Sequence, residues 1–104
     1  MKKLIIDSSN NKEIVVRLKI ESKKYFLKHI VDSKKAQVTL PLIDKILKKY
    51  STGIDNLDSI EVNTGPGSYT GIRIGISIAN TLGFILKIPV NGKKAGELVE
   101  PSYK

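Results

Sequence analysis

Hydrophobic and polar residues alternate along the first third of the chain. Every second residue from Ile14 to Ile20 is hydrophobic, which is the period of a half-buried strand. An apolar run at residues 3–8 precedes this segment and ends in a turn rich in Ser and Asn. A third segment, residues 25–31, follows a break at residues 21–23. Because short turns join the three segments, the pattern predicts an antiparallel three-stranded meander.

The period of the hydrophobic residues becomes helical after residue 38, and it predicts a helix over residues 38–50. We expect Thr39 to be its N-cap and Pro41 to lie in its first turn. Asp44 and Lys48 are four residues apart, so they form a favourable ion pair on a helix. The helix is expected to end near residues 51–53. The apolar positions are Leu40, Leu42, Ile43, Ile46, Leu47 and Tyr50.

A strand and a second helix are predicted in the second half of the chain. Residues 59–64 read as a strand that leads into a glycine-rich loop. Isoleucines alternate over residues 72–78, which alone would favour another strand. The apolar residues continue well beyond them, however, and the run is longer than a usual strand. We therefore expect a helix over residues 72–86, followed by a short strand over residues 88–90.

The glycine-rich loop, residues 65–75, reads Gly-Pro-Gly-Ser-Tyr-Thr-Gly-Ile-Arg-Ile-Gly. Such a loop needs backbone freedom, and it exposes N–H groups at a helix N-terminus, where Ser68 or Thr70 can act as the cap. It can hold an anion, or it can be a tight turn between strand and helix, and the sequence leaves both open. The candidate anion-binding residues are Asp7, Ser8, Gly65, Gly67, Ser68, Thr70, Gly71 and Arg73.

Two charged members of this set also have simpler interpretations. The carboxylate of Asp7 can face a metal or a phosphate, but the simpler interpretation is that it bonds the turn at residues 9–11. Arg73 falls in the first turn of the predicted helix, where the helix dipole disfavours a cation. It therefore needs either a bound anion or a carboxylate such as Asp7 or Glu61.

Gly75, Ala79 and Gly83 form a stripe of small residues, four apart, along the second predicted helix. Such a stripe lets the helix of a partner approach closely. It can also relieve crowding against the domain's own sheet. The sequence does not decide between these two interpretations.

The composition is that of one small folded domain with a strong positive charge. The 104 residues carry a formal net charge of +8, with sixteen lysines and two arginines. This balance favours acidic partners such as RNA, although lysines spread over a solvated surface give the same total. The chain has no cysteine and one histidine, His29, which excludes thiolate chemistry and a multi-histidine metal site. We expect no metal, no cofactor and no catalytic residue.

Residues 72–90 form the most hydrophobic window of the chain. Arg73, Asn80 and Lys87 interrupt it and Pro89 ends it, so we interpret it as a core helix and not as a membrane span. The apolar run at the N-terminus is too short for a signal peptide. The chain is expected to be cytoplasmic, without membrane contact.

The loop motif at residues 65–75 resembles the signature of the TsaB (YeaZ) family, which takes part in the synthesis of threonylcarbamoyladenosine (t6A) in bacterial tRNA. Residues 4–9, 40–47 and 88–90 are also similar to that family. The resemblance implies an α/β fold: a single lobe of the actin/Hsp70/sugar-kinase (ASKHA, ribonuclease H-like) type, with a mixed sheet and β-β-β-α-β-α-β order. It divides the chain into a lobe over residues 1–92 and a polar C-terminal tail over residues 93–104.

The resemblance also implies a function without catalysis. We expect a scaffold or activator subunit that docks through its two helices on TsaD, a threonylcarbamoyl transferase, or on a second copy of itself; a TsaE-like ATPase is a further candidate partner. Two alternatives stay open: a nucleotide- or phosphate-binding half-site of an actin-like ATPase completed by dimerisation, and a basic accessory protein that binds tRNA. The expected partner-interface residues are Leu40, Ile43, Leu47, Ile72, Gly75, Ile76, Ala79, Leu82 and Gly83.

Overall fold

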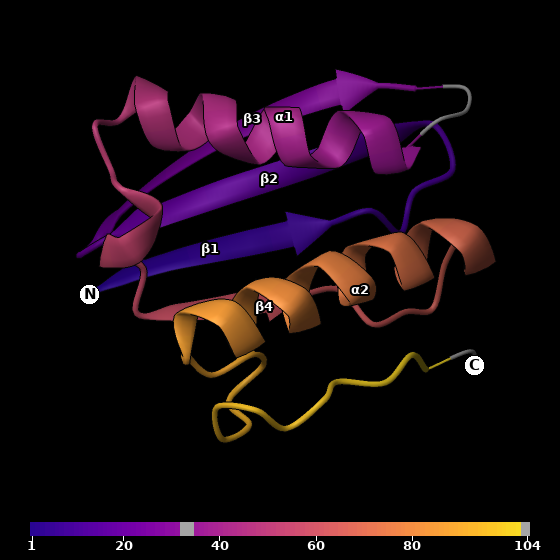
Figure 1. The fold of residues 1–104 in the computed structure, drawn as a ribbon. Coiled ribbons are helices and arrows are strands. Elements are labelled where there is room, and N and C mark those ends of the chain that lie inside the picture. The colour runs from indigo at the N-terminus through magenta and orange to yellow at the C-terminus, as the bar shows by residue number, and fades with distance from the viewer. Residues whose placement is uncertain (32–34, 103–104) are drawn as a thin grey trace.

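The computed structural model describes residues 1–31 and 35–102 of the chain. The antiparallel meander is confirmed, and its strands are β1 (Lys2–Asp7), β2 (Glu13–Ile20) and β3 (Lys23–Ile30). The strand β4 (Ser59–Val62) pairs in parallel with β1, so the sheet is mixed and has the order β3-β2-β1-β4. Two helices, α1 (Lys35–Lys49) and α2 (Tyr69–Leu86), lie side by side against this sheet (Figure 1).

One face of the sheet forms the core with the two helices, because successive strand side chains point to opposite faces. Ile46 of α1 and Ile72 and Ala79 of α2 are fully buried against it. The buried strand residues are Leu4, Ile6, Ile14, Val16, Leu18, Ile60 and Val62. The other face of the sheet carries the remaining side chains of each strand, and many of these are exposed.

The helix α1 begins three residues earlier than the hydrophobic pattern predicts. Thr39 therefore lies inside the helix, where its hydroxyl donates to the carbonyl of Lys35 at 2.7 Å, and its prediction as the N-cap was wrong. Pro41 is likewise in the helix interior and not in the first turn. The earlier start has a physical reason, because the first turn buries Lys35, a charged residue that the hydrophobic pattern does not register. The predicted ion pair of Asp44 and Lys48 is confirmed at 2.9 Å.

The helix α2 begins at Tyr69, three residues before the predicted start. Of the two predicted caps, Ser68 is confirmed, because its hydroxyl accepts a hydrogen bond from the N–H of Gly71 at 3.2 Å, whereas Thr70 lies inside the helix. The predicted strand over residues 88–90 is reduced to a single parallel bridge between Val90 and Ile60. The reason lies in the next residue. The side-chain amide of Asn91 bonds both backbone groups of Val62, at 2.8 and 3.0 Å, and so occupies the edge of β4 in place of a longer strand.

By length and composition alone, α2 is apolar enough to cross a membrane. Its buried residues instead pack against the sheet of the same chain, as in the core helix that the sequence predicts. Its remaining apolar residues, among them Phe84 and Ile85, are exposed.

The C-terminal segment runs along α2 on the side away from α1 (Figure 1). The side-chain amide of Asn80 donates to the carbonyl of Val99 at 3.0 Å and accepts from its N–H at 2.9 Å. The N–H of Ser102 donates to the carbonyl of Thr64 at 2.7 Å. Residues 99–102 are thus attached to the lobe. The last two residues of the expected tail lie outside the described residues.

Candidate functional site

The glycine-rich loop packs tightly against the turn that follows β1. The N–H of Ser68 donates to the carbonyl of Ser9 at 2.7 Å, and the hydroxyl of buried Ser8 donates to the carbonyl of Gly71. A Cβ atom on Gly71 would lie only 2.1 Å from the Ser8 carbonyl oxygen, and one on Gly67 only 2.6 Å from that of Ser9. These two glycines are therefore explained by the close approach of two backbone segments, which supports the tight-turn interpretation of the loop.

Lys35 fills the space between this turn and α1. Its ammonium group donates to the carbonyl of Asn10 and lies 3.5 Å from that of Ser8. Burial lowers the pKa of Lys35, because a charged ammonium is less favourable away from water. Sequence reasoning did not single out this residue, since a lysine at the start of a helix carries no signal of burial.

The carboxylate of Asp7 holds the same turn in place. It accepts hydrogen bonds from the N–H and the hydroxyl of Ser9, at 3.0 and 2.6 Å, and from the Asn63 amide at 3.3 Å. Burial raises the pKa of Asp7, but these hydrogen bonds and the nearby charge of Arg17 outweigh it, so that the pKa lies below the ordinary 3.8. Of the two interpretations of Asp7, bonding within the turn is the one that these contacts support.

Arg73 does not pair with either of the carboxylates expected for it. Its guanidinium donates to the hydroxyl of Tyr69 at 3.3 Å and lies 5.4 Å from the centre of that ring. Asp7 and Glu61 line a hollow on the opposite face of the sheet, and Glu61 pairs with Lys3 at 2.7 Å. The expectation of an Asp7 or Glu61 partner was therefore wrong, because the sheet separates them from α2.

The eight candidate anion-binding residues are not brought together in one pocket. Ser8 is fully buried, whereas Thr70 and Arg73 are exposed on the outer side of α2. The N–H of Gly65 donates to the side chain of Asn63 at 2.9 Å, and that of Gly71 to Ser68. Several groups that an anion would need are thus bonded to the chain itself.

The exposed sides of α1 and α2, together with Pro101 of the C-terminal segment, line a groove. It has a volume of about 730 Å³, and a second hollow of about 390 Å³ continues it and shares Leu40. Leu40 is 52% exposed and Tyr69 is 60% exposed. We call the two together the helix groove, and its main lining residues are Ala36, Leu40, Ile54, Tyr69, Arg73, Ile74, Ile78 and Leu82.

Of the predicted interface residues, Leu40 is exposed in this groove and Leu82 is half-buried there. Ile43 and Leu47 lie at its bottom and are buried, and Ile76 touches it from beneath. Ile72 and the stripe of Gly75, Ala79 and Gly83 are buried in the chain's own core. Most of the predicted interface residues are therefore not accessible to a partner.

The stripe of small residues serves the chain's own packing. A Cβ atom on Gly75 would lie 2.3 Å from the hydroxyl oxygen of Ser8, and one on Gly83 would lie 2.5 Å from a methyl group of Val90. This corrects the assignment of the stripe to a partner interface. Of the two interpretations that the sequence left open, relief of crowding against the sheet agrees with the structure.

Sequence reasoning missed five of the main residues that line the groove: Ala36, Ile54, Tyr69, Ile74 and Ile78. Ile74, Ile78 and Leu82 have the same four-residue spacing as the stripe of small residues, and each precedes one of its members by one position. That second stripe was available in the sequence as a signal. Tyr69 had none, because the loop motif that contains it was interpreted through its glycines.

A mixed four-stranded sheet covered on one face by two helices, with a β-α-β-α second half, is one lobe of the ASKHA-type fold. The solved structure "YeaZ from Pseudomonas aeruginosa" superposes with a TM-score of 0.81 at 29% identity, over 86% of this chain and 41% of that one. The family model described as "TsaD: tRNA N6-adenosine threonylcarbamoyltransferase" matches residues 27–93.

Two curated relatives are named "tRNA threonylcarbamoyladenosine biosynthesis protein TsaB". The one from Haemophilus influenzae is 43% identical over 51 residues, 49% of this chain and 22% of that protein. The one from Bacillus subtilis is 33% identical over 75 residues, 62% of this chain and 33% of that protein. The chain belongs to the TsaB (YeaZ) family, within the wider group that the TsaD model describes. It spans a third or less of the length of these two relatives.

Proposed function

We propose that the chain acts in the synthesis of t6A in tRNA, in the cytoplasm, as a non-catalytic subunit that docks on a TsaD-like threonylcarbamoyl transferase. The observation that carries this proposal is the helix groove. It presents apolar side chains to solvent between two rigid helices, and Leu40 lies at its centre, where both hollows meet. An apolar surface of this kind is typical of a binding site for another protein.

The contacts around the glycine-rich loop support a role without catalysis. Ser8, Asp7 and Lys35 are bonded to groups of the chain itself, which supports a structural role for all three. Within residues 1–31 and 35–102, no three His, Cys, Asp or Glu side chains come together to hold a metal ion.

The variant Leu40→Asp tests the proposal, because it places a charge at the centre of the groove without disturbing the core. Its control is Ile30→Asp, at a residue of β3 that is 74% exposed and lies on the opposite face of the sheet. We expect Leu40→Asp to weaken the complex with the TsaD-like transferase of the same organism by roughly thirtyfold, the effect of losing one interface hot spot of about 2 kcal/mol. Ile30→Asp should leave the affinity unchanged.

Isothermal titration calorimetry measures both affinities directly. The proposal fails if the unmodified chain forms no complex, or if the two variants weaken the complex equally. A second copy of the chain is the other candidate occupant, and sedimentation of the chain alone distinguishes it: a dimer that Leu40→Asp dissociates would show self-association through the groove. A charge at Ala79 would not serve, because that residue is fully buried and its substitution tests folding instead.

A further inference from the structure

The second surface of interest is the face of the sheet that the helices leave uncovered. The strand register places Arg17 opposite Phe26, and Lys19 opposite Lys24, on this face. Lys28 follows two residues after Phe26 and therefore lies on the same side of β3. We call these five residues the cationic sheet face.

Of the cations on this face, Arg17 lies near the carboxylate of Asp7, but the three lysines have no such counter-charge among residues 1–31 and 35–102. No ion pair in the described part of the chain involves Lys19, Lys24 or Lys28. Like charges directly opposite each other on neighbouring strands are unfavourable, so the pair of Lys19 and Lys24 favours an anionic occupant. The other half of the same sheet face differs, because there Lys3 pairs with Glu61 at 2.7 Å.

An aromatic ring lies in the middle of these cations. Phe26 is 61% exposed, with Lys24 and Lys28 on either side of it along the strand and the guanidinium-bearing Arg17 across from it. Flat aromatic rings on a sheet surface stack with unpaired bases, and neighbouring lysines and arginines bind the phosphates between those bases. The combination is thus suited to a polyanion that also carries flat apolar groups.

We propose that the cationic sheet face binds single-stranded RNA, with Phe26 as the stacking platform for a base and Lys24 and Lys28 as phosphate contacts. Stacking on Phe26 requires a base that is free of its neighbours, which a single strand offers and an intact duplex does not. This surface and the helix groove lie on opposite faces of the sheet. RNA binding therefore does not depend on the docking proposed above, and both surfaces can be occupied together.

Fluorescence anisotropy of a labelled single-stranded RNA of about ten nucleotides, titrated with the chain alone at low salt, tests the proposal. The variant Phe26→Leu keeps an apolar residue in the strand but removes the ring, and we expect it to weaken binding about five- to hundredfold. Phe26→Tyr keeps a ring and should restore most of the affinity. A duplex of the same sequence should bind more weakly than the single strand.

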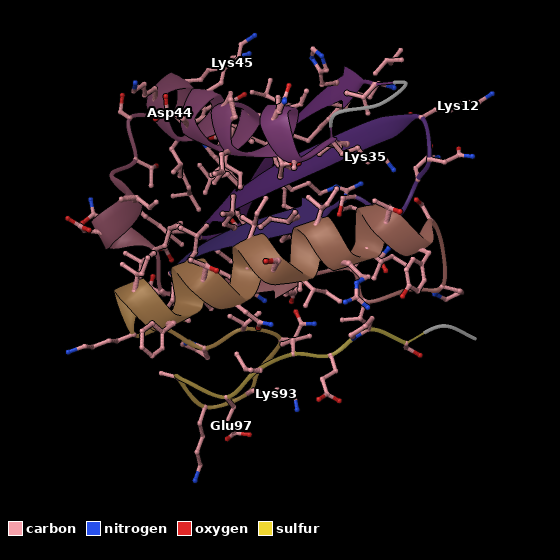
Figure 2. All side chains as sticks on the ribbon, turned by 45° about the vertical axis from the view of Figure 1, so that its right-hand side comes forward. Lys12, Lys35, Asp44, Lys45, Lys93 and Glu97 are labelled. Atoms are coloured by element: carbon pink, nitrogen blue, oxygen red, sulfur yellow. The ribbon has the colours of Figure 1, made fainter. Side chains whose placement is uncertain are left out.

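A matched pair of double variants separates local contacts from general charge. Lys24→Ala with Lys28→Ala removes two charges from the sheet face, and Lys45→Ala with Lys49→Ala removes two from α1, where Lys45 points away from the sheet (Figure 2). Each phosphate contact to a single strand contributes a salt slope of roughly 0.7. The first pair should therefore reduce the slope of log K against log salt by about 1.4, and the second pair should leave it unchanged.

The proposal is overturned if the chain does not bind the single strand, if Phe26→Leu binds as tightly as the unmodified chain, or if both lysine pairs act equally. Circular dichroism shows that each variant is folded before it is compared. The variant Leu40→Asp distinguishes this proposal from the docking proposal, because it should keep full RNA affinity while losing the TsaD-like partner. Either proposal can therefore fail without the other.

Discussion

Replacing Gly75 by alanine separates helix propensity from packing, because the two act in opposite directions at this position. In an exposed helix the change would stabilise the chain by about 1 kcal/mol. In this chain the added methyl carbon would lie 2.3 Å from the hydroxyl oxygen of Ser8 and 3.3 Å from a methyl group of Val62. Ser8 would have to move and give up its hydrogen bond to the carbonyl of Gly71.

The expected net effect follows from these terms. Forcing extra volume into a packed site costs typically 1–3 kcal/mol, and the lost hydrogen bond costs about 1 kcal/mol more. After the gain in helix propensity, Gly75→Ala should lower the free energy of unfolding by about 1–3 kcal/mol. The matched control is Ser77→Ala in the same helix, at an exposed position, which should change stability by less than about 0.5 kcal/mol.

A double-mutant cycle identifies Ser8 as the cause. Ser8→Ala removes the oxygen that the new methyl group would meet, so the double variant should be more stable than the sum of the two single effects by at least about 0.5 kcal/mol. Urea denaturation followed by far-UV circular dichroism gives all four free energies. The reasoning is refuted if Gly75→Ala is as stable as the unmodified chain, or if the two substitutions are simply additive.

Three further predictions concern the turn after β1 and the C-terminal segment. Because the pKa of Asp7 is lowered in the folded chain, its carboxylate stabilises the fold above about pH 4, and this contribution is lost as the pH falls through the folded pKa. Asp7→Asn should therefore be less stable than the unmodified chain at pH 7 and should lose less stability in acid. Urea denaturation midpoints from pH 2 to 7 measure both effects. Lys35→Met leaves the Asn10 carbonyl without its donor and should cost about 1–3 kcal/mol in the same assay, whereas an unchanged midpoint would contradict the contact. Asn80→Ala removes both hydrogen bonds to Val99, so hydrogen exchange at the Val99 amide should accelerate while α2 stays protected. Equal exchange at Val99 in the variant and the unmodified chain would show that the Asn80 side chain does not hold the C-terminal segment.

The strands could be predicted from the sequence because their signal is local. The alternation in residues 14–20 and the short turns on either side determine both the strands and their antiparallel pairing. The cap at Ser68 and the ion pair of Asp44 and Lys48 are equally local, since each joins residues three or four positions apart. The start of α1 was missed because Lys35 is buried by contacts with the distant turn after β1.

Whether the small-residue stripe on α2 faces a partner or the chain's own sheet could not be predicted, for a related reason. Gly75 and Gly83 have the same spacing whether they face a partner or the sheet, and the choice depends on Ser8 and Val90, which come from other parts of the chain. Asn91 illustrates the same limit, because its side chain takes the backbone groups of Val62 that a final strand would have used. Long-range contacts decided each of these points, and periodicity carries no information on them.

Hydrogen–deuterium exchange with mass spectrometry, recorded on the chain with and without the TsaD-like transferase, tests the helix groove as the docking surface most directly. We expect slower exchange in peptides from residues 35–49 and 69–86, which form the two sides of the groove. Exchange in β3, an edge strand whose Phe26 and Ile30 side chains are exposed on the opposite face of the sheet, should stay unchanged. Protection confined to β3, or none in either helix despite a stable complex, would contradict docking through the groove.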